Sequence, residues 1–63
     1  MQNEEDQAFY ETVLFTAEIM IKLKLSKKFI LSVFEEKIFV VNGLDKNKSE
    51  FLIEQIFDLY NKL

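Results

Sequence analysis

Residues 47–62 read NKSEFLIEQIFDLYNK, and this stretch carries the clearest helical pattern in the chain. Its large apolar residues recur at intervals of three and four, so they share about a third of a helical circumference. They are Leu52, Ile53, Ile56, Leu59, Tyr60 and Leu63, and the opposite face carries Glu50, Glu54, Asp58 and Asn61. Asn47 and Glu50 have the spacing of a capping box, and Ser49 is a second candidate cap. The pattern predicts a helix over 47–62.

A second helix is predicted over about 4–24. Asn3 is a candidate cap, and the three acids that follow it suit the positive end of a helix. The apolar face consists of Phe9, Val13, Ala17, Met20 and Leu23, with Leu14 and Ile21 beside it. Residues 19–25 also alternate between apolar and polar, as in a short strand. We favour the helix, because the preceding pattern is long and unbroken.

The third predicted helix covers about 27–42, with Ser26 as its cap. We place a break near Leu25 and Ser26, because one continuous helix would put Lys24 and Lys27 within an apolar seam. The predicted buried face consists of Ile30, Val33, Phe34, Ile38 and Val41. Residues 38–41 have two interpretations. They form either a last helical turn, closed by a left-handed Gly43 with Leu44 folding back on Phe39, or a short strand before an Asn42-Gly43 turn.

These elements predict one all-α domain over residues 1–63, with two or three antiparallel helices joined by short loops. A 63-residue domain buries only about 60% of the surface that its unfolded chain exposes. Because 49% of this chain is hydrophobic, it holds more apolar side chain than so small an interior shelters. We therefore expect a homodimer, in which a two-fold interface pools two cores into a larger helical bundle.

The residue types that are missing argue against an enzyme. The sequence has no His and no Cys, and its eight basic residues are all Lys. Thiol nucleophiles, imidazole bases and soft metal ligands are therefore unavailable. The single glycine, Gly43, cannot form a phosphate-binding loop. Glu50, Glu54 and Asp58 share a helical face that is typical of solvated surface. We predict no catalytic residues, no cofactor and no metal.

Three phenylalanines fall on the otherwise polar sides of the predicted helices. Because aromatic side chains are enriched at protein interfaces, this placement predicts a binding surface. The predicted interface residues are Phe15, Phe39, Phe51, Phe57 and Tyr60. We expect a small non-enzymatic regulator or adaptor that inhibits or modulates a protein partner, by a helix-in-groove mode. The all-lysine basic set fits an AT-rich coding sequence, such as that of a low-GC bacterium or its phage, and a regulator encoded by a phage or another mobile element is compatible with it.

Charge and hydropathy limit the other partners. The net charge is −3, which makes nucleic acid a poor first expectation. The alternative function is nucleic-acid-binding transcriptional regulation through the basic cluster of Lys22, Lys24, Lys27 and Lys28. No apolar run reaches the roughly 18 residues of a membrane span. The acidic start, Met1 to Asp6, differs from a signal peptide, so the expected location is the cytoplasm.

Overall fold

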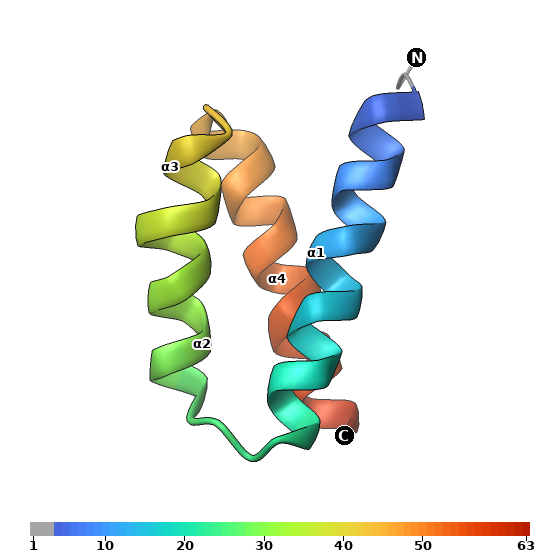
Figure 1. Cartoon of the computed structure of the whole chain (residues 1–63), viewed down its shortest axis with the longest axis vertical. Coiled ribbons are helices and arrows are strands. Elements are labelled where there is room, and N and C mark those ends of the chain that lie inside the picture. Colours follow the sequence, from blue (N-terminus) through green and yellow to red (C-terminus); the bar gives the residue numbers. More distant parts are fainter. Residues whose placement is uncertain (1–3) are drawn as a thin grey trace.

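The computed structural model describes residues 4–63, which form three helices and no strand (Figure 1). The first helix is α1 (Glu4–Lys22). The second is one continuous helix made of α2 (Lys27–Val33), a π-helical turn η1 (Phe34–Ile38) and α3 (Phe39–Val41). The third is α4 (Lys46–Lys62). The all-α class and the three helices are confirmed, while the candidate cap Asn3 lies outside the described residues.

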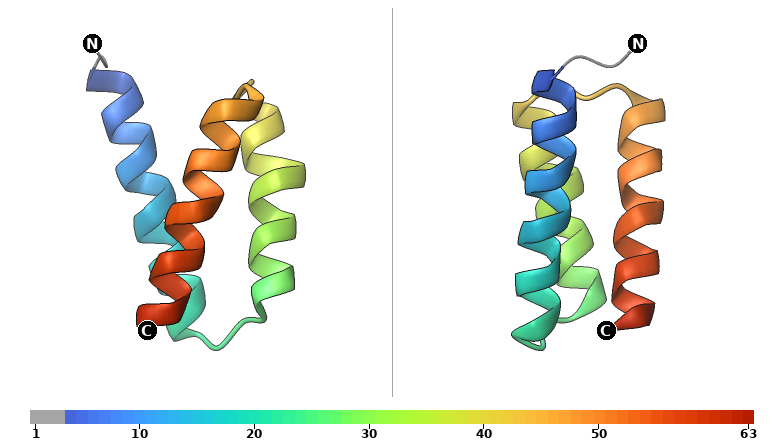
Figure 2. Two further views of the ribbon diagram at one scale, coloured as in Figure 1. Left: turned by 180° about the vertical axis from the view of Figure 1, so that it is seen from behind. Right: turned by 90° about the vertical axis from the view of Figure 1, so that its right-hand side faces the viewer.

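The three helices form two layers. Figure 2 shows α1 and the α2–η1–α3 helix on one side of the molecule and α4 on the other. Both interhelical connections are short, so consecutive helices run antiparallel (Figure 1). α1 and α2 approach each other near their shared loop, and α1 leans away from α3 toward its N-terminal end (Figure 1). The side of α1 that faces away from α4 therefore has no helix packed over it.

The break between α1 and α2 lies where the sequence predicts it. Lys24 adopts a left-handed conformation with φ 67°. Its N–H donates to the carbonyl of Ile21, and the N–H of Leu25 donates to that of Met20, which closes α1 in a Schellman motif. Ser26 then caps α2, because its Oγ accepts from the N–H of Phe29 at 3.1 Å. Residues 19–22 are helical, so the strand interpretation of 19–25 is wrong.

The second loop repeats this closure with the expected glycine. Gly43 has φ 66°, and the N–H of Leu44 donates to the carbonyl of Phe39 at 3.0 Å. The helical interpretation of residues 38–41 is therefore correct. The cap of α4 differs from the prediction. Asp45 caps it by accepting from the N–H of Lys48 at 2.8 Å, and α4 begins before Asn47.

The π-helical turn reverses two sequence-based assignments. The N–H of Phe39 donates to the carbonyl of Phe34, five residues earlier, instead of to the residue four earlier. The wider turn brings Phe39 onto the face of Phe34, so Phe39 is only 3% exposed. The same shift turns Val41 outward, where it is 84% exposed. Phe39 therefore belongs to the core and not to the predicted interface, and Val41 is not in the core.

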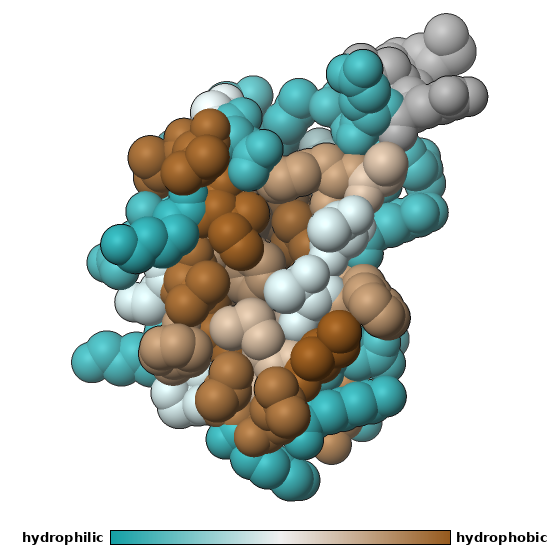
Figure 3. All heavy atoms as spheres, viewed as in Figure 1, coloured by the Kyte–Doolittle hydropathy of each residue, from teal (hydrophilic) through white to brown (hydrophobic). Residues whose placement is uncertain are grey.

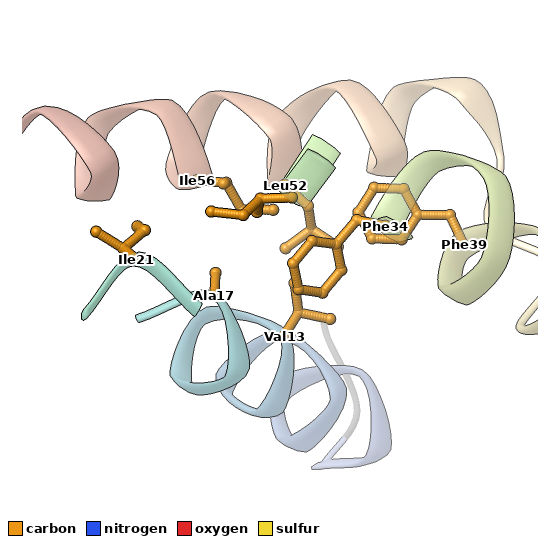
Figure 4. Close-up of a cluster of buried hydrophobic side chains, with 8 residues drawn as sticks. Val13, Ala17, Ile21, Phe34, Phe39, Leu52 and Ile56 are labelled. Atoms are coloured by element: carbon orange, nitrogen blue, oxygen red, sulfur yellow. The ribbon is translucent and has the colours of Figure 1, made fainter. Parts of the chain in front are cut away.

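The core lies where the buried faces of all three helices meet. Figure 4 shows side chains from α1, α4 and the region of the π turn pointing toward one another. The buried residues are Val13, Ala17, Ile21, Ile30, Phe34, Phe39, Leu52 and Ile56. Two further residues of the predicted apolar faces lie outside the core. Leu23 is 66% exposed, because α1 ends at Lys22 and the chain leaves the helical path there. Leu63, which follows α4, is 55% exposed.

Candidate protein-binding surface

The five predicted interface residues do not share one surface. Phe39 is buried, as described above. Phe15 is 63% exposed on α1, and Phe51 is exposed on α4. Phe57 and Tyr60 are half-buried near the C-terminal end of α4. Each of the four residues that remain therefore has to be judged by its own contacts.

Three of these four rings already serve contacts within the chain. The ring of Phe51 lies 5.9 Å from that of Tyr10, so it forms part of the contact between α1 and α4. The Nζ of Lys27 lies 4.2 Å from the centroid of Phe57 and 5.7 Å from that of Tyr60. These cation–π contacts join the start of α2 to the end of α4. Among the predicted residues, Phe15 is the one whose ring contacts no other aromatic ring or cation of the described chain and is largely exposed.

Phe15 belongs to a row of exposed positions along the outer face of α1. We define this outer face as Glu5, Ala8, Thr12, Phe15, Ile19 and Lys22, all of which are exposed. Phe15 follows the buried Val13 by two residues, a rotation of about 200° about the helix axis. Ile19 stands in the same relation to the buried Ala17. The outer face thus lies opposite the core face, and Leu23 extends its apolar part beyond the end of α1.

The spacing of the outer face is that of a coiled-coil seam. Its six positions follow one another at intervals of three, four, three, four and three residues, which is the heptad alternation. The four inner positions are Ala8, Thr12, Phe15 and Ile19. The Oγ1 of Thr12 donates to the carbonyl of Ala8 at 2.8 Å, so its hydroxyl has a partner within the helix. Thr12 therefore makes the middle of the seam less polar than its residue type suggests.

The seam is uneven in shape. Ala8, Glu11, Thr12 and Phe15 line a shallow depression on the surface of α1. Two of these lining residues, Ala8 and Thr12, have small side chains, and Phe15 is 63% exposed beside them. Figure 3 shows apolar side chains gathered over the face that α1 and α2–α3 present away from α4. The surface thus combines an exposed phenylalanine ring with a depression beside it.

Charged side chains border the seam along its length. Glu5 and Glu11 lie toward its N-terminal end, and Glu18 and Lys22 lie toward its C-terminal end. The Nζ of Lys22 is 3.5 Å from Oε1 of Glu18, in a contact that leaves much of the lysine side chain in solvent. Such an exposed pair contributes little to the stability of the monomer. Lys22 therefore remains available to a partner's carboxylate.

The four lysines of the predicted basic cluster differ in their contacts within the chain. Lys22 contacts Glu18, and Lys27 lies over the aromatic rings of α4. Lys24 and Lys28 are exposed, the first within the loop and the second on α2. Two of the four lysines thus take part in contacts within the chain.

A separate cleft of about 310 Å³ opens between the start of α1 and the loop before α4. Phe9, Tyr10 and Leu44 line it, and an ion pair between Asp6 Oδ2 and Lys48 Nζ, 3.6 Å apart, lies at the same place. Within residues 4–63, no group of three metal-ligating side chains is arranged to hold an ion. In the same part of the chain, no helix is long and apolar enough to cross a bilayer.

Sequence reasoning found Phe15 but missed the seam to which it belongs. Ile19 was assigned to an alternating segment and Leu23 to the core, whereas both are exposed. The missed signal was the second heptad series on α1, running from Glu5 through Ala8, Thr12 and Phe15. Phe29 and Val40 are also exposed, and neither was singled out from the sequence.

The fold and this surface define a small all-α protein with an unpartnered apolar helix face. No known protein family, curated protein or solved structure matches the chain.

Proposed function

We propose that this protein is a small non-enzymatic regulator or adaptor that acts by protein–protein interaction. The outer face of α1 is its docking surface, and the bound element is an amphipathic helix of another polypeptide chain. A helix is the fitting occupant because the exposed positions follow a heptad alternation, which meshes with a second helix by knobs-into-holes packing.

One observation carries this proposal: α1 has large apolar side chains on two opposite faces, and its own fold covers only one of these faces. Val13, Ala17 and Ile21 are buried, while Phe15 and Ile19 are exposed about half a turn away. Fully burying a Phe or Ile side chain is worth about 1.5–3 kcal/mol. Covering the outer face with a second helix therefore provides a driving force for association that the isolated chain leaves unused.

The alternative function, nucleic-acid binding through Lys22, Lys24, Lys27 and Lys28, has weaker support. The salt-dependent affinity of such proteins comes from lysines that are free to neutralise phosphates. Here Lys27 lies over Phe57, and Lys22 is close to Glu18. Binding of a mixed-sequence duplex that weakens steeply with added salt would favour this alternative.

Affinity capture from the native host tests the proposal. Three tagged baits are compared: the unaltered protein, Phe15→Glu and Phe29→Glu. Phe29 is a matched control because it is an exposed phenylalanine on a different helix, α2. We expect a protein that is retained by the unaltered bait and by Phe29→Glu but lost with Phe15→Glu. Equal retention by all three baits would overturn the assignment of the docking surface.

A further inference from the structure

We infer that the helix best matched to the outer face of α1 is α1 of a second copy, packed antiparallel about a two-fold axis. This inference rests on the proposed function, because it names an occupant for the same docking surface. It is carried by two features of that face, the order of its side-chain sizes and the order of its charges.

The first feature is that the small and large side chains occupy opposite halves of the seam. Ala8 and Thr12 lie in the N-terminal half, and Phe15 and Ile19 lie in the C-terminal half. An antiparallel pair centred between Thr12 and Phe15 places each large side chain opposite a small one. Phe15 of one copy then faces Thr12 of the other, and Ile19 faces Ala8. Alternating large and small residues across an interface fills it without gaps or overlap.

A parallel pair would lack this match. Each position would face its own copy, so two Phe15 rings would meet in one layer and two alanines would leave space in another. Overfilled and underfilled layers both cost stability. The size order of the seam therefore selects the antiparallel direction.

The depression on α1 supports the same register. Ala8, Glu11, Thr12 and Phe15 line it, and Thr12 is the residue that faces Phe15 of the second copy. In the antiparallel pair, the protruding ring of each copy therefore sits over the depression of the other. Because the two contacts are equivalent, the interface is self-complementary, as a two-fold dimer requires.

The second feature is that the seam ends in opposite charges. Glu5 occupies its first position and Lys22 its last, and both are exposed. The antiparallel register places Glu5 of each copy opposite Lys22 of the other, while a parallel register would place like charges together. Complementary charges at the ends of a helix pair favour the correct register and partner. The order of side-chain sizes and the charges at the two ends of the seam thus favour the same arrangement.

Cysteine pairing tests the arrangement directly, because the native sequence contains no cysteine to give background. Chains carrying Ala8→Cys are mixed with tagged chains carrying Ile19→Cys under mild oxidation. In the antiparallel register the two positions face each other, so we expect a mixed disulfide dimer. Two Ala8→Cys chains should not pair, because their cysteines lie about 16 Å apart along the helix axis. The control is Gln7→Cys, an exposed position beside the seam, which should give little product with Ile19→Cys.

Sedimentation equilibrium provides the second measurement. The unaltered protein should show a concentration-dependent dimer at concentrations up to about millimolar. Phe15→Glu should weaken self-association at least about tenfold, a change of about 1.4 kcal/mol, while Phe29→Glu should leave it unchanged. Circular dichroism of each variant checks that it remains helical.

Three results would overturn the inference: a monomer at every concentration, a dimer that is insensitive to Phe15→Glu, or efficient pairing of two Ala8→Cys chains. None of these results affects whether the capture experiment finds a protein partner that the Phe15→Glu bait fails to retain. Conversely, a dimer with the expected cysteine pairing, but without any captured partner that depends on Phe15, would support the inference and count against the regulatory function. The two experiments therefore separate the two proposals.

Discussion

The main-chain N–H of Phe39 donates to the carbonyl oxygen of Phe34, and the centroids of the two rings lie 5.8 Å apart. This bond spans five residues, one more than in an α-helix, so the turn between the two phenylalanines contains an extra residue. The exposed residues Glu35, Glu36 and Lys37 occupy that turn. The arrangement places both rings in the core without altering the helix on either side.

Deletion of Glu35 should therefore be tolerated. It converts the π turn into an α turn and leaves Phe34 and Phe39 four residues apart, on one helical face. We expect a change in unfolding free energy within about 1 kcal/mol. Deletion of Glu54, an exposed glutamate between the buried Leu52 and Ile56, is the matched control. It should rotate the rest of α4 by about 100° and unfold the protein. Thermal denaturation of both variants measures the difference.

Charged substitutions should separate core rings from surface rings. Phe39→Glu buries a carboxylate where the structure provides no partner, and a 63-residue domain has only about 3–9 kcal/mol of total stability. We expect this variant to be unfolded at 25 °C. Phe15→Glu should keep its helical circular dichroism, because that ring is 63% exposed. A folded Phe39→Glu variant would contradict the assignment of Phe39 to the core.

The two loop residues with positive φ should respond in opposite directions. Lys24 adopts the left-handed region at a cost that glycine does not have, so Lys24→Gly should raise stability by up to about 1 kcal/mol. Gly43→Ala should lower stability by about 1 kcal/mol through its backbone alone, because no atom lies within 4 Å of the added Cβ. Urea denaturation measures both changes. The idea fails if Lys24→Gly destabilises the protein as much as Gly43→Ala does.

The N-cap of α4 can be verified in the same way. Removing the carboxylate that accepts from the N–H of Lys48 should make Asp45→Ala about 1 kcal/mol less stable. Asn47→Ala should change stability little, because Asn47 lies inside α4 and is exposed. A larger loss of stability for Asn47→Ala than for Asp45→Ala would show that Asn47 is the N-cap, as the sequence predicted.

The contact between Lys27 and α4 predicts a difference between neighbouring lysines. Lys27→Gln should lower stability by about 0.5–1 kcal/mol, because it removes a cation 4.2 Å from the Phe57 ring centroid. Lys28→Gln is the control, since Lys28 is exposed and does not lie over an aromatic ring. Because the two variants lose the same charge, the difference between their melting temperatures reports the contact itself. Equal melting temperatures would argue against it.

Local patterns were sufficient to predict the three helices. Ser26 caps α2, Gly43 closes α3, and the apolar spacing in 47–62 gives α4, because each of these signals acts within one or two helical turns. The prediction was wrong where a position depended on the helix path. Helical projection assumes a constant rotation per residue, and the π turn breaks that assumption between Phe34 and Phe39. This is why Phe39 is buried and Val41 is exposed, the reverse of the prediction.

The candidate surface could be predicted only in part. Phe15 stood out because it lies among polar residues, but the helical pattern placed Leu23 on the buried face and did not single out Ile19. α1 carries apolar residues on two sides, and either side could have packed against α4. The contacts of Val13, Ala17 and Ile21 decided which side became core and which became the outer face.

The amino-acid sequence by itself determined that this protein is all helical, where its helices begin and end within a few residues, and that it lacks imidazole and thiol chemistry. Those properties depend on residue identity and on contacts between near neighbours along the chain. Only the tertiary structure decided that Phe39 is buried, that Lys27 covers the rings of α4, and that α1 keeps a free apolar face. Those properties depend on which apolar faces pack against one another, because the three helices carry more apolar faces than one small core can bury.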